Sequence, residues 1–356
     1  MTQTIKFDSL SSLFNALKEV EKDYQIFCPT KQDGTEVFLP LVEIKEDNLK
    51  ATYEILSKNE PPLFSIKSFL FPNSEIYLKF KREKDSYEFS VHSQEETPTV
   101  VLGGKPCDVE SFGMIDMVFL QEPVDTFYQQ KRENTILITS VCNQKGPNCL
   151  CDEFGVDKCK PKVSDILLVL GEQTTQKDEA VYLEAVSERG ENFLEKLDKS
   201  TESEGESNTP NLEGEIHQKD VEKLSPEKIK DIMENLYDSP IWAEFAMRCL
   251  GCGICTYYCP TCHCYDINDF HRKDKGVRYR SWDSCMFSNF SNMAGGHNPR
   301  PSKEDRIKNR FFHKLNYFVK QQGPLACVGC GRCAKNCPAG ISIGTVLKKI
   351  GVGKHV

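Results

Sequence analysis

Two short runs near the end of the chain each carry four cysteines at one spacing. The runs are CLGCGICTYYCP at residues 249–260 and CVGCGRCAKNCP at residues 327–338. Each reads Cys-x2-Cys-x2-Cys-x3-Cys-Pro, a spacing that lets thiolates wrap a [4Fe-4S] cubane. A single match is weak evidence, but two matches in one chain predict two [4Fe-4S] clusters that pass electrons one at a time.

The order of the cysteines also predicts which of them share a cluster. In paired runs of this kind the fourth cysteine of each run binds the cluster of the other run. One predicted ligand set is therefore Cys249, Cys252, Cys255 and Cys337. The second predicted set is Cys327, Cys330, Cys333 and Cys259.

Glycines and prolines in the runs suit a loop that wraps a cluster, and the cysteine spacing favours iron over zinc. Glycines at 251, 253, 329 and 331 permit tight backbone conformations, and Pro260 and Pro338 end the preceding turn. Zinc is the alternative, but structural zinc sites usually pair two short two-cysteine knuckles. Because thiolates occupy every coordination position, no iron is open to a substrate, and we assign no catalytic residue.

The remaining cysteines are harder to assign. Four of them follow apolar runs that resemble strands: Cys107, Cys142, Cys149 and Cys151. We hypothesise that these four bind a third iron–sulfur cluster. The alternative is that they are inert buried thiols or only a partial ligand set. Three more follow the first run, where packing is favoured over metal binding: Cys262, Cys264 and Cys285. Cys28 and Cys159 have no partner that the sequence suggests.

The elements that must position these cysteines point to an α+β protein of two domains. Short apolar runs at residues 36–42, 100–102, 135–141 and 166–170 alternate with helical stretches and predict a mixed α/β domain over residues 1–196. An amphipathic helix is expected within the first twenty residues. Residues 197–223 are polar and acidic and predict a flexible linker.

A ferredoxin-like domain with two [4Fe-4S] clusters is expected over residues 224–356. Ser225 and Pro226 are typical of a helix start. The segment at 261–326, between the two cysteine runs, is expected to form a largely helical insertion.

Charge is unevenly distributed in this 356-residue chain of net charge −8 with 17 cysteines. Residues 271–320 carry twelve Lys or Arg against four Asp or Glu, a net charge of +8. This basic segment would contact an acidic partner or cover the clusters, or it would form a solvated helix face around residues 303–320. Its basic and aromatic residues match no nucleic-acid-binding module, so we predict no nucleic-acid partner.

Several signals are missing from the sequence. There is no signal peptide and no apolar stretch long enough for a membrane span, which favours a cytoplasmic protein that does not enter a membrane. A reducing compartment argues against disulfides. No Gly-x-Gly-x-x-Gly fingerprint or phosphate loop occurs, so a nicotinamide site is expected on another chain, although a flavin could bind without a short motif.

Longer stretches resemble a known family. The specific stretches are CLGCGICTYYCPTCHCYDINDF at 249–270, WDSC, MAGGH, and CVGCGRCAKNCPAGIS at 327–342. A looser likeness extends to GGKPCDVESFGMID and YQQKRENTILITSVC in the N-terminal half. They resemble the iron–sulfur (β) subunit of cytosolic sulfhydrogenases and the related iron–sulfur subunit of anaerobic sulfite reductase. The acidic linker has no counterpart in the family pattern.

The resemblance implies a hetero-oligomeric, cytoplasmic complex of anaerobic metabolism. In it this chain would be a non-catalytic subunit that relays electrons between a flavin- and NAD(P)H-binding subunit and a terminal subunit. The terminal partner would be a hydrogenase, a sulfite reductase or a disulfide-reductase-linked flavoprotein. The alternative function is a redox-sensing or structural iron–sulfur module without a relay role.

Overall fold

The computed structural model describes residues 3–84, 86–91, 97–171, 180–198 and 223–352. The chain divides into two compact units. The first comprises Met1–Ile66, Glu96–Leu224 and Val328–Cys330, and the second comprises Lys67–Glu95, Ser225–Cys327 and Gly331–Val356. This division differs from the expected boundary at residue 196, because residues 67–95 belong to the second unit. The linker predicted over residues 197–223 lies almost entirely outside the described residues.

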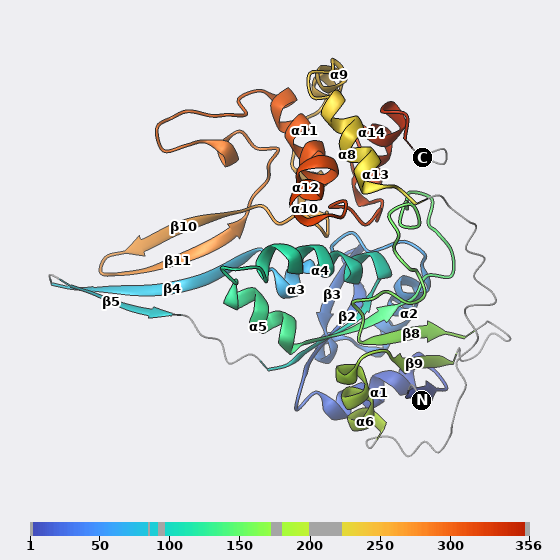
Figure 1. The fold of residues 1–356 in the computed structure, drawn as a ribbon. Helices are drawn as coiled ribbons and strands as arrows, with labels where there is room; N and C mark the ends of the chain where they lie inside the picture. The colour runs from blue at the N-terminus through green and yellow to red at the C-terminus, as the bar shows by residue number, and fades with distance from the viewer. Residues whose placement is uncertain (1–2, 85, 92–96, 172–179, 199–222, 353–356) are drawn as a thin grey trace. The chain divides into compact units, whose positions relative to one another are not determined.

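The first unit is built on a seven-stranded mixed sheet with the order β1-β9-β8-β7-β6-β2-β3 (Figure 1). The central pairs β2–β6, β6–β7 and β7–β8 are parallel, and the outer pairs are antiparallel. The four strands predicted from apolar runs are confirmed as β3, β6, β7 and β8. The strands are β1 (Thr4–Phe7), β2 (Gln25–Gln32), β3 (Thr35–Pro40), β6 (Thr99–Gly104), β7 (Thr135–Ser140), β8 (Ile166–Leu170) and β9 (Val181–Ala185).

Helices cover both faces of this sheet (Figure 1). All six residues of β7 are buried, as expected of a central parallel strand covered on both sides. The helix predicted near the N-terminus is confirmed as α1, where Ser9 is the N-cap and Leu10, Leu13, Phe14, Leu17 and Val20 are all buried. The helices are α1 (Leu10–Val20), the 3-10 turn η1 (Leu41–Glu43), α2 (Glu46–Ser57), α4 (Pro106–Phe119), α5 (Thr126–Asn134) and α6 (Glu188–Asp198).

The second unit contains a four-stranded antiparallel sheet with the order β10-β11-β4-β5. Two hairpins form it, and they run side by side as a long, narrow ribbon (Figure 1). Polar and apolar residues alternate at 265–268 and at 277–280, and Lys273 takes the positive φ of a tight turn, 54°. The insertion expected to be largely helical therefore begins with a β-hairpin. The strands are β4 (Ser74–Glu83), β5 (Ser86–Val91), β10 (Tyr265–Arg272) and β11 (Lys275–Trp282).

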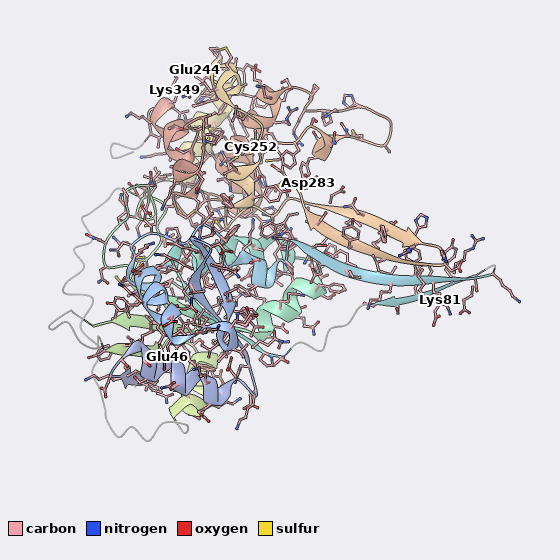
Figure 2. The ribbon with its side chains drawn as sticks, turned by 180° about the vertical axis from the view of Figure 1, so that it is seen from behind. Glu46, Lys81, Glu244, Cys252, Asp283 and Lys349 are labelled. Carbon is pink, nitrogen blue, oxygen red and sulfur yellow. The ribbon has the colours of Figure 1, made fainter. Side chains whose placement is uncertain are left out.

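Short helices surround the cysteine runs in the second unit. The predicted helix start at Ser225 is confirmed, since its side chain accepts a hydrogen bond from the Lys228 amide. Lys349 of α14 forms an ion pair with Glu244 of α9 at 2.9 Å (Figure 2). The elements are α3 (Lys67–Leu70), α8 (Pro226–Asn235), α9 (Ile241–Arg248), α10 (Ile254–Tyr257), η2 (Asn289–Ser291), α11 (Lys303–Phe312), the π-helix η3 (His313–Tyr317), α12 (Phe318–Gln322), α13 (Arg332–Lys335) and α14 (Ile343–Lys349).

Within the described part of the chain, every helix is too short or too polar to cross a lipid bilayer.

Candidate iron–sulfur centres

The two cysteine runs repeat the same backbone conformation. Gly251 and Gly253 have φ values of 69° and 76°, and Gly329 and Gly331 have 61° and 77°. These left-handed values are readily available to glycine and costly for other residues. The second glycine of each run precedes a four-residue helix, α10 or α13, and these two helices pack against each other. The sequence repeat is therefore also a structural repeat.

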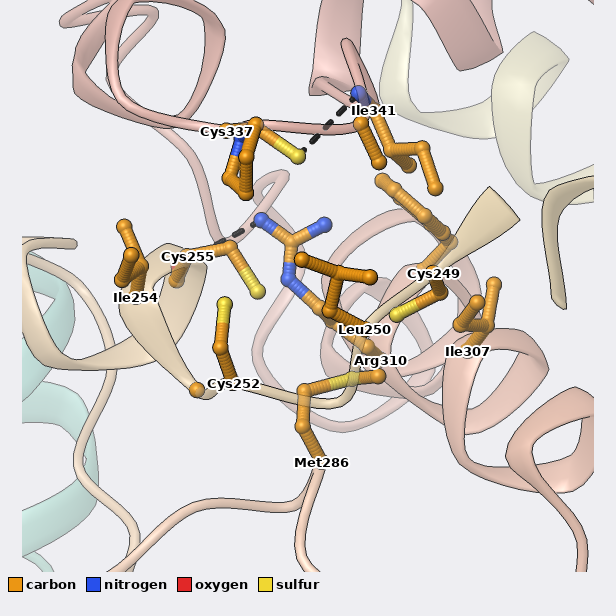
Figure 3. Close-up of a pocket in the computed structure, with 14 residues that line it drawn as sticks. Cys249, Leu250, Cys252, Ile254, Cys255, Met286, Ile307, Arg310, Cys337 and Ile341 are labelled. Atoms are coloured by element: carbon orange, nitrogen blue, oxygen red, sulfur yellow. Dashed lines mark hydrogen bonds between the residues drawn. The ribbon is translucent and has the colours of Figure 1, made fainter. Parts of the chain in front are cut away.

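Four thiols line one cavity in the second unit (Figure 3). Cys249, Cys252 and Cys255 come from the first run and Cys337 from the second, and the space between atoms at this site, which is partly open to solvent, is about 450 Å³. The Gly251 amide donates to the Cys249 sulfur and the Ile341 amide to the Cys337 sulfur, each at 3.3 Å. Amide hydrogen bonds of this kind stabilise a thiolate and tune the potential of a bound cluster.

A buried arginine lies in the same cavity. The side chain of Arg310, on α11, reaches among these cysteines, and its Nη2 donates to the carbonyl of Cys255 at 3.4 Å (Figure 3). Arg310 is only 4 % exposed, and its Nε has no hydrogen-bond partner. Burial acts to lower the pKa of Arg310, but the thiolates of Cys255 and Cys333 raise it above its usual value. A permanently charged, buried guanidinium requires a counter-charge, so this cavity favours an anionic group.

The arrangement suits a cubane. Among the described residues, no group of three or more His, Cys, Asp or Glu side chains is arranged to hold a single metal ion. A cubane carries iron at four corners and takes one thiolate at each. Four thiols spaced around a cavity, with amide donors and a cation, fit that group.

The predicted second set is divided between the units. Cys259, Cys327 and Cys333 belong to the second unit, and Cys330 belongs to the first. The thiol of Cys259 lies 3.5 Å from the ammonium of Lys314 and 3.2 Å from the hydroxyl of Thr261. A hydrogen bond from Cys262 and the positive charges of Lys314 and Lys67 hold the pKa of Cys259 well below its usual range, although burial opposes them. Cys259 is thus prepared to bind as a thiolate.

The three cysteines that follow the first run form thiol pairs. Cys262 hydrogen-bonds to Cys259, and Cys264 hydrogen-bonds to Cys285. The hydrogen bonds from Cys285 lower the pKa of Cys264 to about 7, against the effect of burial. Lys67 donates to the carbonyls of Cys259 and Cys262, at 2.9 Å each.

The cysteines of the first unit fall into two groups. Cys107, Cys149 and Cys151 share a small buried cluster with Cys330. Cys142 is also buried, and its thiol interacts electrostatically with that of Cys151. The four residues proposed from sequence for a third cluster are therefore neighbours. Cys28, on β2, lies apart in the main core of the first unit, and Cys159 is buried but belongs to neither cluster.

Comparison with known proteins identifies the family. Residues 248–341 match the 4Fe-4S dicluster domain. Over 354 residues, covering 96 % of this chain and 95 % of the relative, the chain is 30 % identical to the sulfhydrogenase 2 subunit beta of Pyrococcus furiosus. The chain belongs to the sulfhydrogenase β-subunit family. The resemblance found in the sequence is confirmed, and so is the prediction of two [4Fe-4S] clusters.

Three buried cationic side chains of this β-subunit family member were not predicted from the sequence. Arg306, Arg310 and Lys314 recur every four residues, and all three are buried. The interpretation of this stretch as a solvated face is therefore wrong for these three residues. The signal was present, because Ile307, Phe311 and Leu315 follow them at the same spacing and are buried too.

Proposed function

We propose that this chain is the non-catalytic iron–sulfur subunit of a cytoplasmic hetero-oligomeric complex. It passes single electrons between a partner that binds flavin and NAD(P)H and a terminal hydrogenase or reductase subunit. One cluster is held by Cys249, Cys252, Cys255 and Cys337. The other is held by Cys259, Cys327, Cys330 and Cys333, following the crossed pattern of paired runs.

The cavity beside Arg310 carries this proposal. Four thiols from both runs line it, so a cubane bound there has a protein ligand for each iron. A site with no open coordination position suits electron transfer and leaves no iron for a substrate. When bound, the clusters supply reversible one-electron oxidation and reduction.

The residues around the two sites set the polarity and charge next to each cluster. The apolar side chains of Leu250, Ile254, Met286, Ile307 and Ile341 line the first cavity. Arg310 at this cavity and Lys314 at Cys259 place buried positive charge next to thiolates. Positive charge favours the reduced, more negative state of a cluster, so both residues raise the reduction potentials.

Potentiometric EPR on the anaerobically purified full chain tests the relay. We expect both clusters to reduce and reoxidise reversibly, with spin coupling in the doubly reduced protein. Clusters that cannot be reduced, or that decompose on reduction, would support the alternative of a structural or sensing module. A preparation that contained zinc and no sulfide would contradict both.

The partners are tested separately. Anaerobic purification of the native complex followed by mass spectrometry should recover a flavoprotein together with a hydrogenase or reductase subunit. Recovery of the chain alone at native concentration would contradict the proposed complex. Substrate turnover by the isolated chain would contradict the non-catalytic role.

A further inference from the structure

Four buried cysteines of the first unit gather beyond the ends of two neighbouring parallel strands. Strands β6 and β7 are paired, with Gly104 opposite Thr139. Cys107 lies in the first turn of α4, just after β6, and Cys142 lies two residues after β7. The carboxyl ends of parallel strands meet at one edge of a sheet, which brings these two residues to the same place.

The loop after β7 supplies the other two thiols. Cys107, Cys149 and Cys151 share one buried cluster, and Cys142 is buried at the start of the loop that carries Cys149 and Cys151. The Cys142 amide donates to the carbonyl of Lys158 at 3.2 Å, which closes this loop back toward β7. The exposed fractions are uniformly low, at 6 % for Cys107, 8 % for Cys142, 7 % for Cys149 and 7 % for Cys151.

A buried lysine accompanies these thiols. Lys105 is 0 % exposed, and its ammonium donates to two neutral oxygens, the Leu56 carbonyl at 2.6 Å and the Ser140 hydroxyl at 3.2 Å. Lys105 is the N-cap residue of α4, and Cys107 and Asp108 follow it in the first turn of that helix. A buried ammonium is costly without a counter-charge. The same combination of buried cation and thiols occurs at Arg310 and at Lys314.

The cysteine loop is held tightly to the segment at 328–330. The Leu150 amide donates to the Gly329 carbonyl at 2.7 Å. A Cβ on Gly329 would lie 2.3 Å from the Leu150 carbonyl, so only glycine fits there. The Cys149 thiol lies 3.9 Å from the carbonyl oxygen of Cys330. The loop with two of the four thiols is therefore bonded directly to the segment that contains a proposed ligand of the second cluster.

We propose that Cys107, Cys142, Cys149 and Cys151 bind a third iron–sulfur cluster in the first unit, with Lys105 as its buried counter-charge. Four thiolates are the ligand set of both [4Fe-4S] and [2Fe-2S] clusters. This inference rests on the proposed relay and extends it. The hydrogen bond between Leu150 and Gly329 puts the third cluster next to Cys330, a proposed ligand of the dicluster domain. Electrons would then enter or leave the relay through the first unit.

Inert packing is the competing explanation, and it makes a different prediction. Inert thiols would contribute to packing alone, and replacing one of them would leave the iron content unchanged.

Iron and sulfide analysis of the full chain, purified and reconstituted without oxygen, decides between these explanations. The proposal predicts about twelve irons per chain if the third cluster is a cubane, or about ten if it is [2Fe-2S], against about eight for the dicluster domain alone. Cys151→Ser should lose about four irons if the third cluster is a cubane, or about two if it is [2Fe-2S]. It should keep the EPR signals of the other two clusters. Cys28→Ser is the matched control, since Cys28 is a buried thiol outside the group, and it should keep all the iron.

The outcomes separate this inference from the proposed function. About eight irons in the wild-type chain, unchanged in Cys151→Ser, would overturn the third cluster, and so would zinc in its place. If Cys151→Ser fails to fold, Lys105→Met offers a second measurement, because removal of the counter-charge should lower the potential of the third cluster only. Failure of the relay would appear instead as irreversible reduction of the two dicluster-domain clusters.

Discussion

The ammonium of Lys314 lies 3.5 Å from the thiol of Cys259, and the lysine is only 3 % exposed. It also donates to the Thr261 hydroxyl at 2.8 Å and the Ala326 carbonyl at 2.9 Å, which hold it in place. A fixed positive charge next to a proposed cluster ligand should control the potential of that cluster.

Lys314→Met should lower the midpoint potential of the cluster that Cys259 binds. Unit charges about 4 Å apart interact by about 4 kcal/mol at an effective dielectric constant of about 20. For a one-electron couple this corresponds to a shift on the order of 100 mV, measured by potentiometric EPR. Lys320→Met is the control, because Lys320 forms an ion pair with Glu234 at the surface and should leave the potential unchanged. Equal shifts in both variants would refute a local effect.

Arg310→Gln should lower the potential of the other cluster by a similar amount. The guanidinium lines the cavity of Cys249, Cys252, Cys255 and Cys337, and the amide of glutamine is neutral. Arg310→Lys keeps the charge and should restore most of the potential, which separates charge from packing. The expectation fails if the glutamine and lysine variants have the same midpoint.

The crossed ligand pattern predicts which variants share a phenotype. Cys337→Ala should lose the same cluster as Cys249→Ala, although the two residues belong to different runs, because both line one cavity. Cys327→Ala should lose the other cluster. In the reduced state, Cys337→Ala and Cys249→Ala should show the same EPR signal, from the cluster that remains in both. Cys327→Ala should show a different signal. Matching signals in Cys337→Ala and Cys327→Ala would mean that each run binds its own cluster.

Gly329→Ala should destabilise the chain more than Gly340→Ala. Both glycines have left-handed φ values, 61° and 64°, so each substitution carries a backbone strain of about 1 to 2 kcal/mol. Only at Gly329 would the new Cβ also meet a backbone carbonyl, that of Leu150 at 2.3 Å, whereas the space at Gly340 is open. Anaerobic denaturant titrations should show a lower unfolding midpoint for Gly329→Ala, and equal midpoints would count against the tight contact.

Cys264 should titrate near neutral pH. Its pKa is lowered to about 7, first by the hydrogen bond from the Cys285 side chain. The reactive thiolate should therefore form as the pH rises through about 7, and iodoacetamide labelling followed by mass spectrometry should follow that rise. In Cys285→Ala the donor is missing, so the labelling midpoint should move toward higher pH. An unchanged midpoint would show that Cys285 is not the cause.

Much of the local structure was predictable because neighbouring residues determine it. The serine caps at Ser9 and Ser225 and the left-handed glycines of both runs depend only on local backbone chemistry. The buried strand β7 was predictable in the same way, from its continuous apolar run. The hairpin at 265–282 was missed because the basic residues in this stretch obscured its alternating pattern.

The sequence by itself determined that this chain binds two cubanes, because eight cysteines at a fixed spacing with glycines between them already specify the chemistry of the ligands. Only the tertiary structure decided that β4 pairs with β11, that Arg310 and Lys314 lie buried against thiols, and that Cys107, Cys149 and Cys151 share one buried cluster. These relationships join residues far apart along the chain. They depend on strand pairing and burial, which local spacing does not encode.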